Sequence, residues 1–313
     1  MKRHLLLILA VALLALGAIA LTLGATTAVR QDDSCQLTSQ AVLRSCRLGA
    51  QSDLWLALGK CNNVLDPAER TACKQKASDD LTDALRTCNE QNSARQAVCQ
   101  GLGEEPYDPV IEPADFVDEI DNPYFPLKPG TTFFYEGQTA EGLQRDEFFV
   151  TRNTRVILGV TCVEVRDRVT VNGEVIEDTL DWFAQDRDGN VWYFGENAKQ
   201  LADGLIVGVE GSWTGGVDGA KPGIIMKARP IIGDFYRQEF SLDTAEDVAR
   251  VLRLNESVTV PAGSFHHCLK TEDTSPLEPG VVDNKFYAPE VGFVLSIDPS
   301  SGEKLKLVRI TRK

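Results

Sequence analysis

The chain has 313 residues, of which 43% are hydrophobic, and a formal net charge of −14 at pH 7. This acidic excess argues against binding to nucleic acid or to an anionic membrane surface, because either would repel the protein. The length fits one or two globular domains.

Residues 1–28 carry the pattern of an export signal. Lys2 and Arg3 precede a nearly continuous apolar run from Leu5 to Gly24, and small residues follow up to Ala28. A basic start, an apolar stretch and small residues together predict a secretory signal peptide. About 20 apolar residues also suffice to span a bilayer, so an uncleaved N-terminal membrane anchor is the alternative. Either interpretation places the rest of the chain outside the cytoplasm, whether secreted, periplasmic or anchored.

Six of the eight cysteines lie in residues 34–100 and predict a disulfide-stapled helical hairpin. The two residue numbers of each expected pair have the same sum, as two antiparallel helices folded about one turn would produce. Successive steps of 11 and 15 residues also return to one helix face. A metal site or redox relay is the alternative, but this segment has no histidine and no Cys-x-x-Cys motif. The expected disulfides are Cys35–Cys99, Cys46–Cys88 and Cys61–Cys73.

The turn of this hairpin is predicted just before Pro67. Asp66 is a good N-cap residue, Pro67 suits the first helical position, and Glu69 follows three residues after the cap. Residues 101–130 then contain six prolines and eight acidic residues, which predict an extended, solvated linker. Calcium binding by the acidic residues is the alternative. Apolar residues such as Phe116 and Ile120 suggest that the later part of the linker packs along the next domain.

Residues 131–313 show the period-two alternation of β-strands. Val163, Val165 and Val169 share one face of a predicted strand, and Asn172-Gly173 directly after it is a strong hairpin signal. Successive short strands joined by turns predict a mostly antiparallel sheet. We therefore expect an α+β protein, in which a disulfide-stapled antiparallel helical hairpin precedes a curled β-sheet that forms a half-barrel or barrel.

The remaining two cysteines, Cys162 and Cys268, are predicted to form a fourth disulfide. Each is expected to point away from the apolar face of its strand, as it would if the two strands were neighbours. A zinc site that includes His266 and Cys268 is the alternative, but a bridged cysteine cannot coordinate a metal as a thiolate.

Two segments of the β domain are candidate sites. Asp186, Asp188 and Asn190 have the alternating oxygen spacing of a calcium loop, but Val191 and Asn197 stand where an EF-hand needs glycine and glutamate. A plain hairpin loop is therefore preferred there. The candidate ligand contacts are Trp213, in the glycine-rich stretch 211–223, and Trp192, in the aromatic run 191–194. A loop tryptophan tucked over an open barrel end is an equal alternative for Trp213.

The sequence contains no convincing catalytic set. It has only three histidines and no serine in a Gly-x-Ser-x-Gly elbow, so a non-enzymatic protein without a cofactor is expected. The alternative is a metal-dependent hydrolase or another extracytoplasmic enzyme that uses the 186–190 loop or His266.

Two further stretches carry a resemblance. Residues 258–265 with 268–270, and residues 286–294, resemble segments that recur in a family of uncharacterised exported bacterial β-rich proteins, with Glu290 here where glycine often stands. The resemblance covers most of residues 120–310. In general character this part of the chain is also similar to half-barrel proteins that carry lipoproteins or other apolar ligands in the cell envelope. This similarity implies an apolar small molecule or an envelope protein as the partner. A structural envelope protein that docks a partner through the helical hairpin is the alternative.

Overall fold

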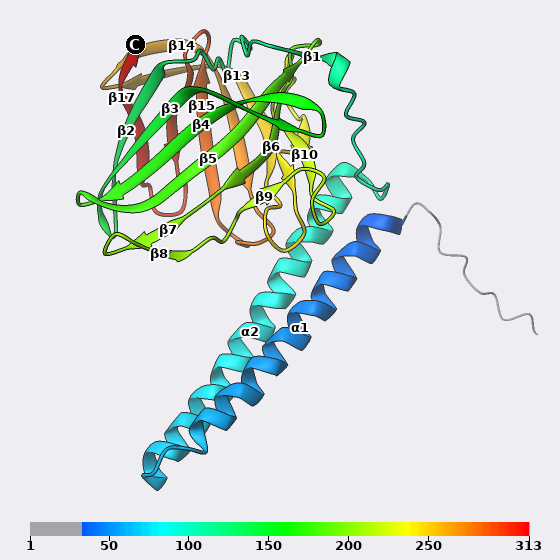
Figure 1. Ribbon diagram of the computed structural model, residues 1–313, viewed down its shortest axis with the longest axis vertical. Helices are drawn as coiled ribbons and strands as arrows, with labels where there is room; N and C mark the ends of the chain where they lie inside the picture. The colour runs from blue at the N-terminus through cyan, green and yellow to red at the C-terminus, as the bar shows by residue number, and fades with distance from the viewer. Residues whose placement is uncertain (1–32, 313) are drawn as a thin grey trace, which may run out of the picture.

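The computed structural model describes residues 33–312 (Figure 1). The export signal predicted for residues 1–28 lies outside the described residues. No helix within residues 33–312 is both long enough and apolar enough to cross a membrane. Two long helices come first and a large antiparallel sheet follows them, so the α+β prediction is confirmed.

The helical hairpin has the predicted disulfides. Helix α1 (Ser34–Cys61) and helix α2 (Pro67–Leu102) lie side by side and extend away from the sheet (Figure 1). The three pairs Cys35–Cys99, Cys46–Cys88 and Cys61–Cys73 join them, with Cα–Cα separations of 5.6, 5.8 and 5.6 Å. Few other side chains of the two helices are buried, so the disulfides supply much of what holds the helices together.

Helix α2 begins where its capping signal predicts. The Asp66 side chain accepts hydrogen bonds from the backbone N–H groups of Ala68 and Glu69, both at 2.8 Å. Pro67 takes the first helical position, where the missing N–H costs nothing because that group would have no partner inside the helix.

The hairpin meets the sheet near the C-terminal end of α2. Arg95 forms a buried bidentate ion pair with Glu246, with Nε–Oε2 and Nη2–Oε1 distances of 2.9 and 2.8 Å. Gln91 Nε2 donates to the carbonyl oxygen of Leu277 at 2.9 Å. A Cβ atom on Gly101 would lie 2.5 Å from the ring of Phe235, so only glycine allows this close approach. The ion pair, the Gln91 hydrogen bond and the close contact at Gly101 together hold the hairpin against the sheet.

The acidic, proline-rich segment after α2 runs along the sheet. It contains the 3-10 turn η2 (Pro113–Asp115) and the short strand β1 (Phe116–Val117), which pairs with strand β5 (Glu174–Asp186). Phe116 makes edge-on contacts with the rings of Trp192 and Phe194, and Ile120 is buried in the main core. The later part of this segment is therefore packed against the sheet, as its apolar residues indicate.

The sheet rolls into a nearly closed barrel in which all strand pairings are antiparallel (Figure 1). Strand β17 pairs back onto β2, which joins the end of the described chain to the first long strand. On the other side β10 pairs with β6 and β12, and β11 pairs with β13. The strands are β2 (Thr131–Thr139), β3 (Gly142–Ile157), β4 (Val160–Val171), β5 (Glu174–Asp186), β6 (Val191–Asn197), β7 (Gln200–Ala202), β8 (Leu205–Gly208), β9 (Trp213–Thr214), β10 (Lys221–Met226), β11 (Phe235–Arg237), β12 (Glu239–Phe240), β13 (Val248–Val260), β14 (Gly263–Thr274), β15 (Val282–Ala288), β16 (Gly292–Ile297) and β17 (Lys304–Arg312).

Two separate clusters of buried residues cover the two faces of the sheet. The large cluster includes Val163, Val165 and Phe183. The small one includes Cys162, Trp182 and Phe194, with Phe116 packed against it. Successive residues of a strand point to opposite faces, so Val163 and Cys162 belong to different clusters. We assign the large cluster to the barrel interior and the small one to the outer face beneath the β1 segment.

The predicted disulfide between Cys162 and Cys268 is wrong. Both cysteines are free and buried, and they belong to different clusters. Cys162 lies on β4, whereas Cys268 lies on β14, where shifts in the β13–β14 register change which residues face inward. Their strands are not neighbours, so a shared orientation could not bring the sulfurs together. Burial raises the pKa of the Cys162 thiol to about 12, which keeps it protonated and unreactive.

Candidate ligand-binding cavity

The barrel contains a partly open cavity of about 570 Å³. Its walls come from residues that alternate along strands β2 to β6 and along β15 and β16, because every second side chain of a strand points inward. Opposite members of neighbouring strands meet on this face, as Phe133 does with Phe148 and Tyr135 with Asp146. The strand register therefore decides which side chains share each level of the cavity.

One part of the cavity wall is aromatic. The rings of Phe183 and Tyr193 stack with centroids 4.7 Å apart, and the rings of Phe133 and Phe148 meet edge-on at 6.2 Å. Phe293 lies 5.0 Å from the ring of Tyr135 across the β2–β17–β16 side of the barrel. All six residues line the cavity and present apolar faces to whatever occupies it.

The other part of the wall is acidic. Nine carboxylate side chains line the cavity, against two lysines. Of these lysines, Lys304 is exposed, and Lys285 is already paired with the buried Asp273 at 3.0 Å. The lining therefore has a large excess of acidic over basic side chains. Its acidic residues are Asp146, Asp167, Asp181, Glu196, Glu239, Asp247, Asp283, Asp298 and Glu303.

Several of these carboxylates are held by a donor. The Tyr193 hydroxyl donates to Asp181 at 2.6 Å, and the Trp213 indole Nε1 donates to Glu239 Oε2 at 2.8 Å. Asp167 differs from them, because its Oδ1 is buried and has no hydrogen-bond partner among the described residues. A buried carboxylate oxygen without a donor is costly, so this atom is a natural contact for a positively charged group.

Burial and mutual repulsion raise the pKa values of these acids. Desolvation is the main cause for Asp146 and Asp181, and a hydrogen bond to each, from Gln144 and Tyr193 respectively, partly offsets it. The pKa of Asp146 is thereby raised to about 6 and that of Asp181 to about 7. The same desolvation, with neighbouring carboxylates added, raises the pKa of Glu239 to about 8 and that of Glu196 to about 9. Near neutral pH the empty cavity therefore retains several protons that a bound cation would displace.

These raised pKa values predict that the protein without ligand loses stability as pH rises from 5 to 8.5. The carboxyl groups bind protons more tightly in the folded protein than in the unfolded chain, where their pKa values are near 4. Their contribution is complete below that value and is lost as pH passes through the folded values of about 6 to 9. We expect a loss of about 2–4 kcal/mol, measured by urea unfolding at several pH values.

The control for this prediction is the double variant Asp181→Asn with Glu239→Gln, which should flatten the pH dependence. The lowered pKa of Asp298, about 2, acts only in acid and leaves this window unaffected. A free energy of unfolding that stays level or increases between pH 5 and 8.5 would contradict the assignment of raised pKa values.

The two candidate tryptophans do not line the cavity. Trp213 is buried behind it, where its ring meets Tyr193 edge-on at 5.4 Å and its indole N–H holds Glu239. It thus orients two cavity residues. Trp192 belongs with the small cluster, where its Nε1 donates to Asp186 Oδ2 at 2.8 Å. Neither residue is placed for direct contact with a ligand inside the barrel.

The candidate calcium loop is a hydrogen-bonded hairpin turn. The Asp186 carboxylate accepts from the backbone N–H and the side-chain amide of Asn190, each at 2.8 Å, and from Trp192. Its oxygens are thus engaged within the turn, and Asp188 is exposed. His266 is also exposed, and its Nδ1 lies 3.0 Å from the hydroxyl of Ser257. These residues do not form a common site.

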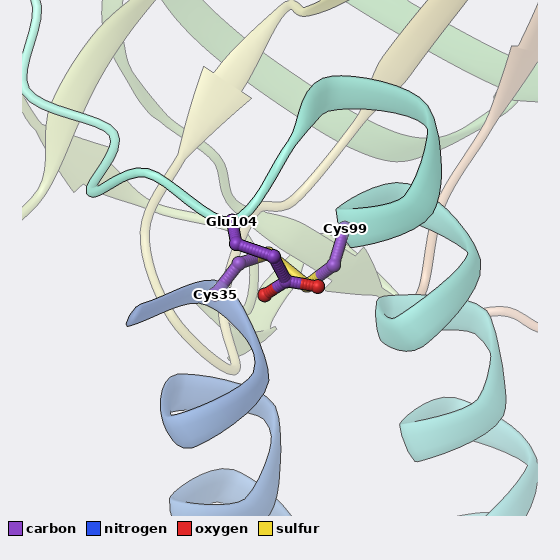
Figure 2. Close-up of side chains that lie close together, drawn as sticks. All are labelled: Cys35, Cys99 and Glu104. Atoms are coloured by element: carbon purple, nitrogen blue, oxygen red, sulfur yellow. A yellow bond between two sulfur atoms is a disulfide. The ribbon is translucent and has the colours of Figure 1, made fainter. Parts of the chain in front are cut away.

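Among the described residues, one group brings three potential metal-ligand atoms within 4.8 Å of one another. It consists of Cys35, Cys99 and Glu104, drawn in Figure 2. The two sulfurs form a disulfide and so are not available as thiolates. The Glu104 carboxylate accepts a hydrogen bond from the backbone N–H of Gln36 at 3.1 Å. The group therefore caps the start of α1 and is not a metal site.

Sequence reasoning missed the acidic wall. A signal for it exists within β4, where Asp167 interrupts the inward-facing series Val163, Val165 and Val169. A charged residue on an otherwise apolar strand face points to a polar interior. The number of such residues that meet in one cavity depends on the closure of the barrel.

No protein-family model and no curated protein matches the chain. A solved structure described as a putative lipoprotein from Parabacteroides distasonis is similar to it, with a TM-score of 0.34 and 16% sequence identity. The alignment covers 60% of this chain and 98% of that one.

Proposed function

We propose that this protein is an exported binding protein that holds a small molecule with an apolar body inside the barrel. The cavity carries the proposal. Its volume of about 570 Å³ lies within the roughly 300–1,000 Å³ typical of small-molecule sites, and aromatic rings form much of its wall. The three disulfides fit an oxidising compartment, which supports export. The residues that line the cavity include no histidine and no cysteine, so binding is favoured over catalysis.

Titration with Nile red, a neutral apolar fluorophore, tests this proposal. We expect saturable binding of one dye per chain. Gln144→Trp, which places a large ring in the cavity, should weaken binding at least tenfold. Gln138→Trp is the matched control, because Gln138 is exposed on the neighbouring strand β2 and faces outward.

Dye binding to the Gln138→Trp variant should equal binding to the unmodified protein. Absence of saturable binding, or equal binding by both tryptophan variants, would exclude the cavity as the site. Native mass spectrometry of protein purified from its own source would then show whether a ligand is carried at all.

A further inference from the structure

We propose that the cavity selects organic cations, in which an ammonium or guanidinium group is attached to an apolar body. This inference rests on the proposed binding function and names the class of ligand. It follows from three features of the cavity: the distribution of its charges, the spacing of its carboxylates and the position of its aromatic rings.

The cavity wall has many more acidic than basic side chains. Lys285 is the half-buried lysine of the lining, and Asp273 already pairs with it. Asp181 and Glu239 are each 7% exposed, so bulk water solvates neither carboxyl group well. Asp167 also lines the cavity and keeps its buried Oδ1 without a hydrogen-bond partner among the described residues. A cation placed between these groups would satisfy Asp167 and relieve the repulsion between the others.

The spacing of the carboxylates favours an organic cation over a metal ion. A calcium ion requires six to eight oxygen ligands at about 2.3–2.6 Å, so its carboxylates must converge closely. In residues 33–312 the group with three ligand atoms within 4.8 Å of one another consists of Cys35, Cys99 and Glu104. None of these three residues lines the cavity. The acids instead spread around the wall on strands β3, β4, β5, β6 and β15. Such an arrangement suits a larger ligand whose N–H groups reach several walls.

The aromatic rings supply the second half of the recognition. Tyr135 and Asp146 lie opposite each other on β2 and β3, and Phe183 is two residues from Asp181 on β5. An apolar body packed on these rings would therefore place its charged end level with the acids. The same rings attract a cation electrostatically through their faces, which adds to selection for positive charge.

A set of ligands with one decyl chain and different head groups tests this inference. Decyltrimethylammonium and decylamine should compete with Nile red at least tenfold better than decanol, and decanoate should compete worst. Equal competition by the amine, the alcohol and the acid would overturn the inference and leave the proposed binding function intact. Competition by none of them, together with no Nile red binding, would remove both.

A charge-neutral variant identifies the acids responsible. Asp167→Asn should weaken decylamine binding about five- to tenfold and leave decanol binding unchanged, since only the charged head group loses its partner. Asp188→Asn, which makes the same change on an exposed turn, is the control and should alter neither affinity. Should the first variant fail to fold, Asp181→Asn, in which the amide oxygen can still accept from Tyr193, gives the same comparison. Equal losses for decylamine and decanol would contradict a charge-specific role.

Discussion

Reduction of the three disulfides is expected to unfold most of the helical hairpin while the barrel stays folded. Helices α1 and α2 extend away from the sheet and bury few side chains of their own (Figure 1). Two helices with so little shared core are marginal in water, and each disulfide contributes about 2–4 kcal/mol by restricting the unfolded chain. Without the disulfides, the hairpin retains its contacts with the sheet near Arg95 and Gly101 and a few hydrogen bonds between the helices, such as that from Ser39 to Asn92.

Circular dichroism separates the two parts of the molecule. In the described chain α1 and α2 are the α-helices, so the signal at 222 nm should fall by more than half on reduction. The near-ultraviolet signal of the buried barrel aromatics, such as Tyr193 and Trp213, should persist. An unchanged 222 nm signal and melting temperature in the reduced protein would show that helix packing alone holds the hairpin.

The second large effect is expected from Arg95→Met at the junction of hairpin and barrel. Arg95 and Glu246 are 5% and 2% exposed, and the Glu246 carboxylate also accepts from the backbone N–H of Asp243 at 2.8 Å. Removal of the guanidinium would leave a carboxylate buried without its counter-charge. Breaking a buried pair in this way costs about 3–5 kcal/mol, which urea unfolding would measure.

A matched control lies on the same helix. Arg86 forms ion pairs with Asp83 and Glu90, but its side chain is 62% exposed. Arg86→Met should therefore cost less than about 1 kcal/mol, because exposed pairs are screened by solvent. Adding Glu246→Leu to Arg95→Met should recover much of the lost stability, since no buried charge then remains. Similar losses for Arg86→Met and Arg95→Met would show that the junction does not depend on the buried pair.

The helical hairpin could be predicted from local features. The equal sums of the cysteine positions follow from two helices folded about one turn, and the structure confirms all three pairs. Asp66 and Pro67 act within one turn of the helix that they start. Such signals depend on chain neighbours or on one short turn, so the sequence alone determines them.

The sequence predicts that the second part of the chain is a mostly antiparallel sheet, but not the order of its strands or their register. Alternation at Val163 and Val165 indicates a strand with one buried face, and the structure confirms that both residues are buried. The error for Cys162 and Cys268 came from the assumption that similar orientation means neighbouring strands. Strand order and register shifts in β13–β14 decide that question, and both arise from contacts between distant parts of the chain.

The sequence by itself determined the stapled helices, the antiparallel strands and the acidic balance of the chain. Only the tertiary structure decided that carboxylates from separate strands would line one cavity together with aromatic rings. The physical reason is closure of the barrel. When β17 pairs with β2, inward-facing residues far apart in the chain come to line one cavity. Their charges then repel and their pKa values rise, which no single strand could produce alone.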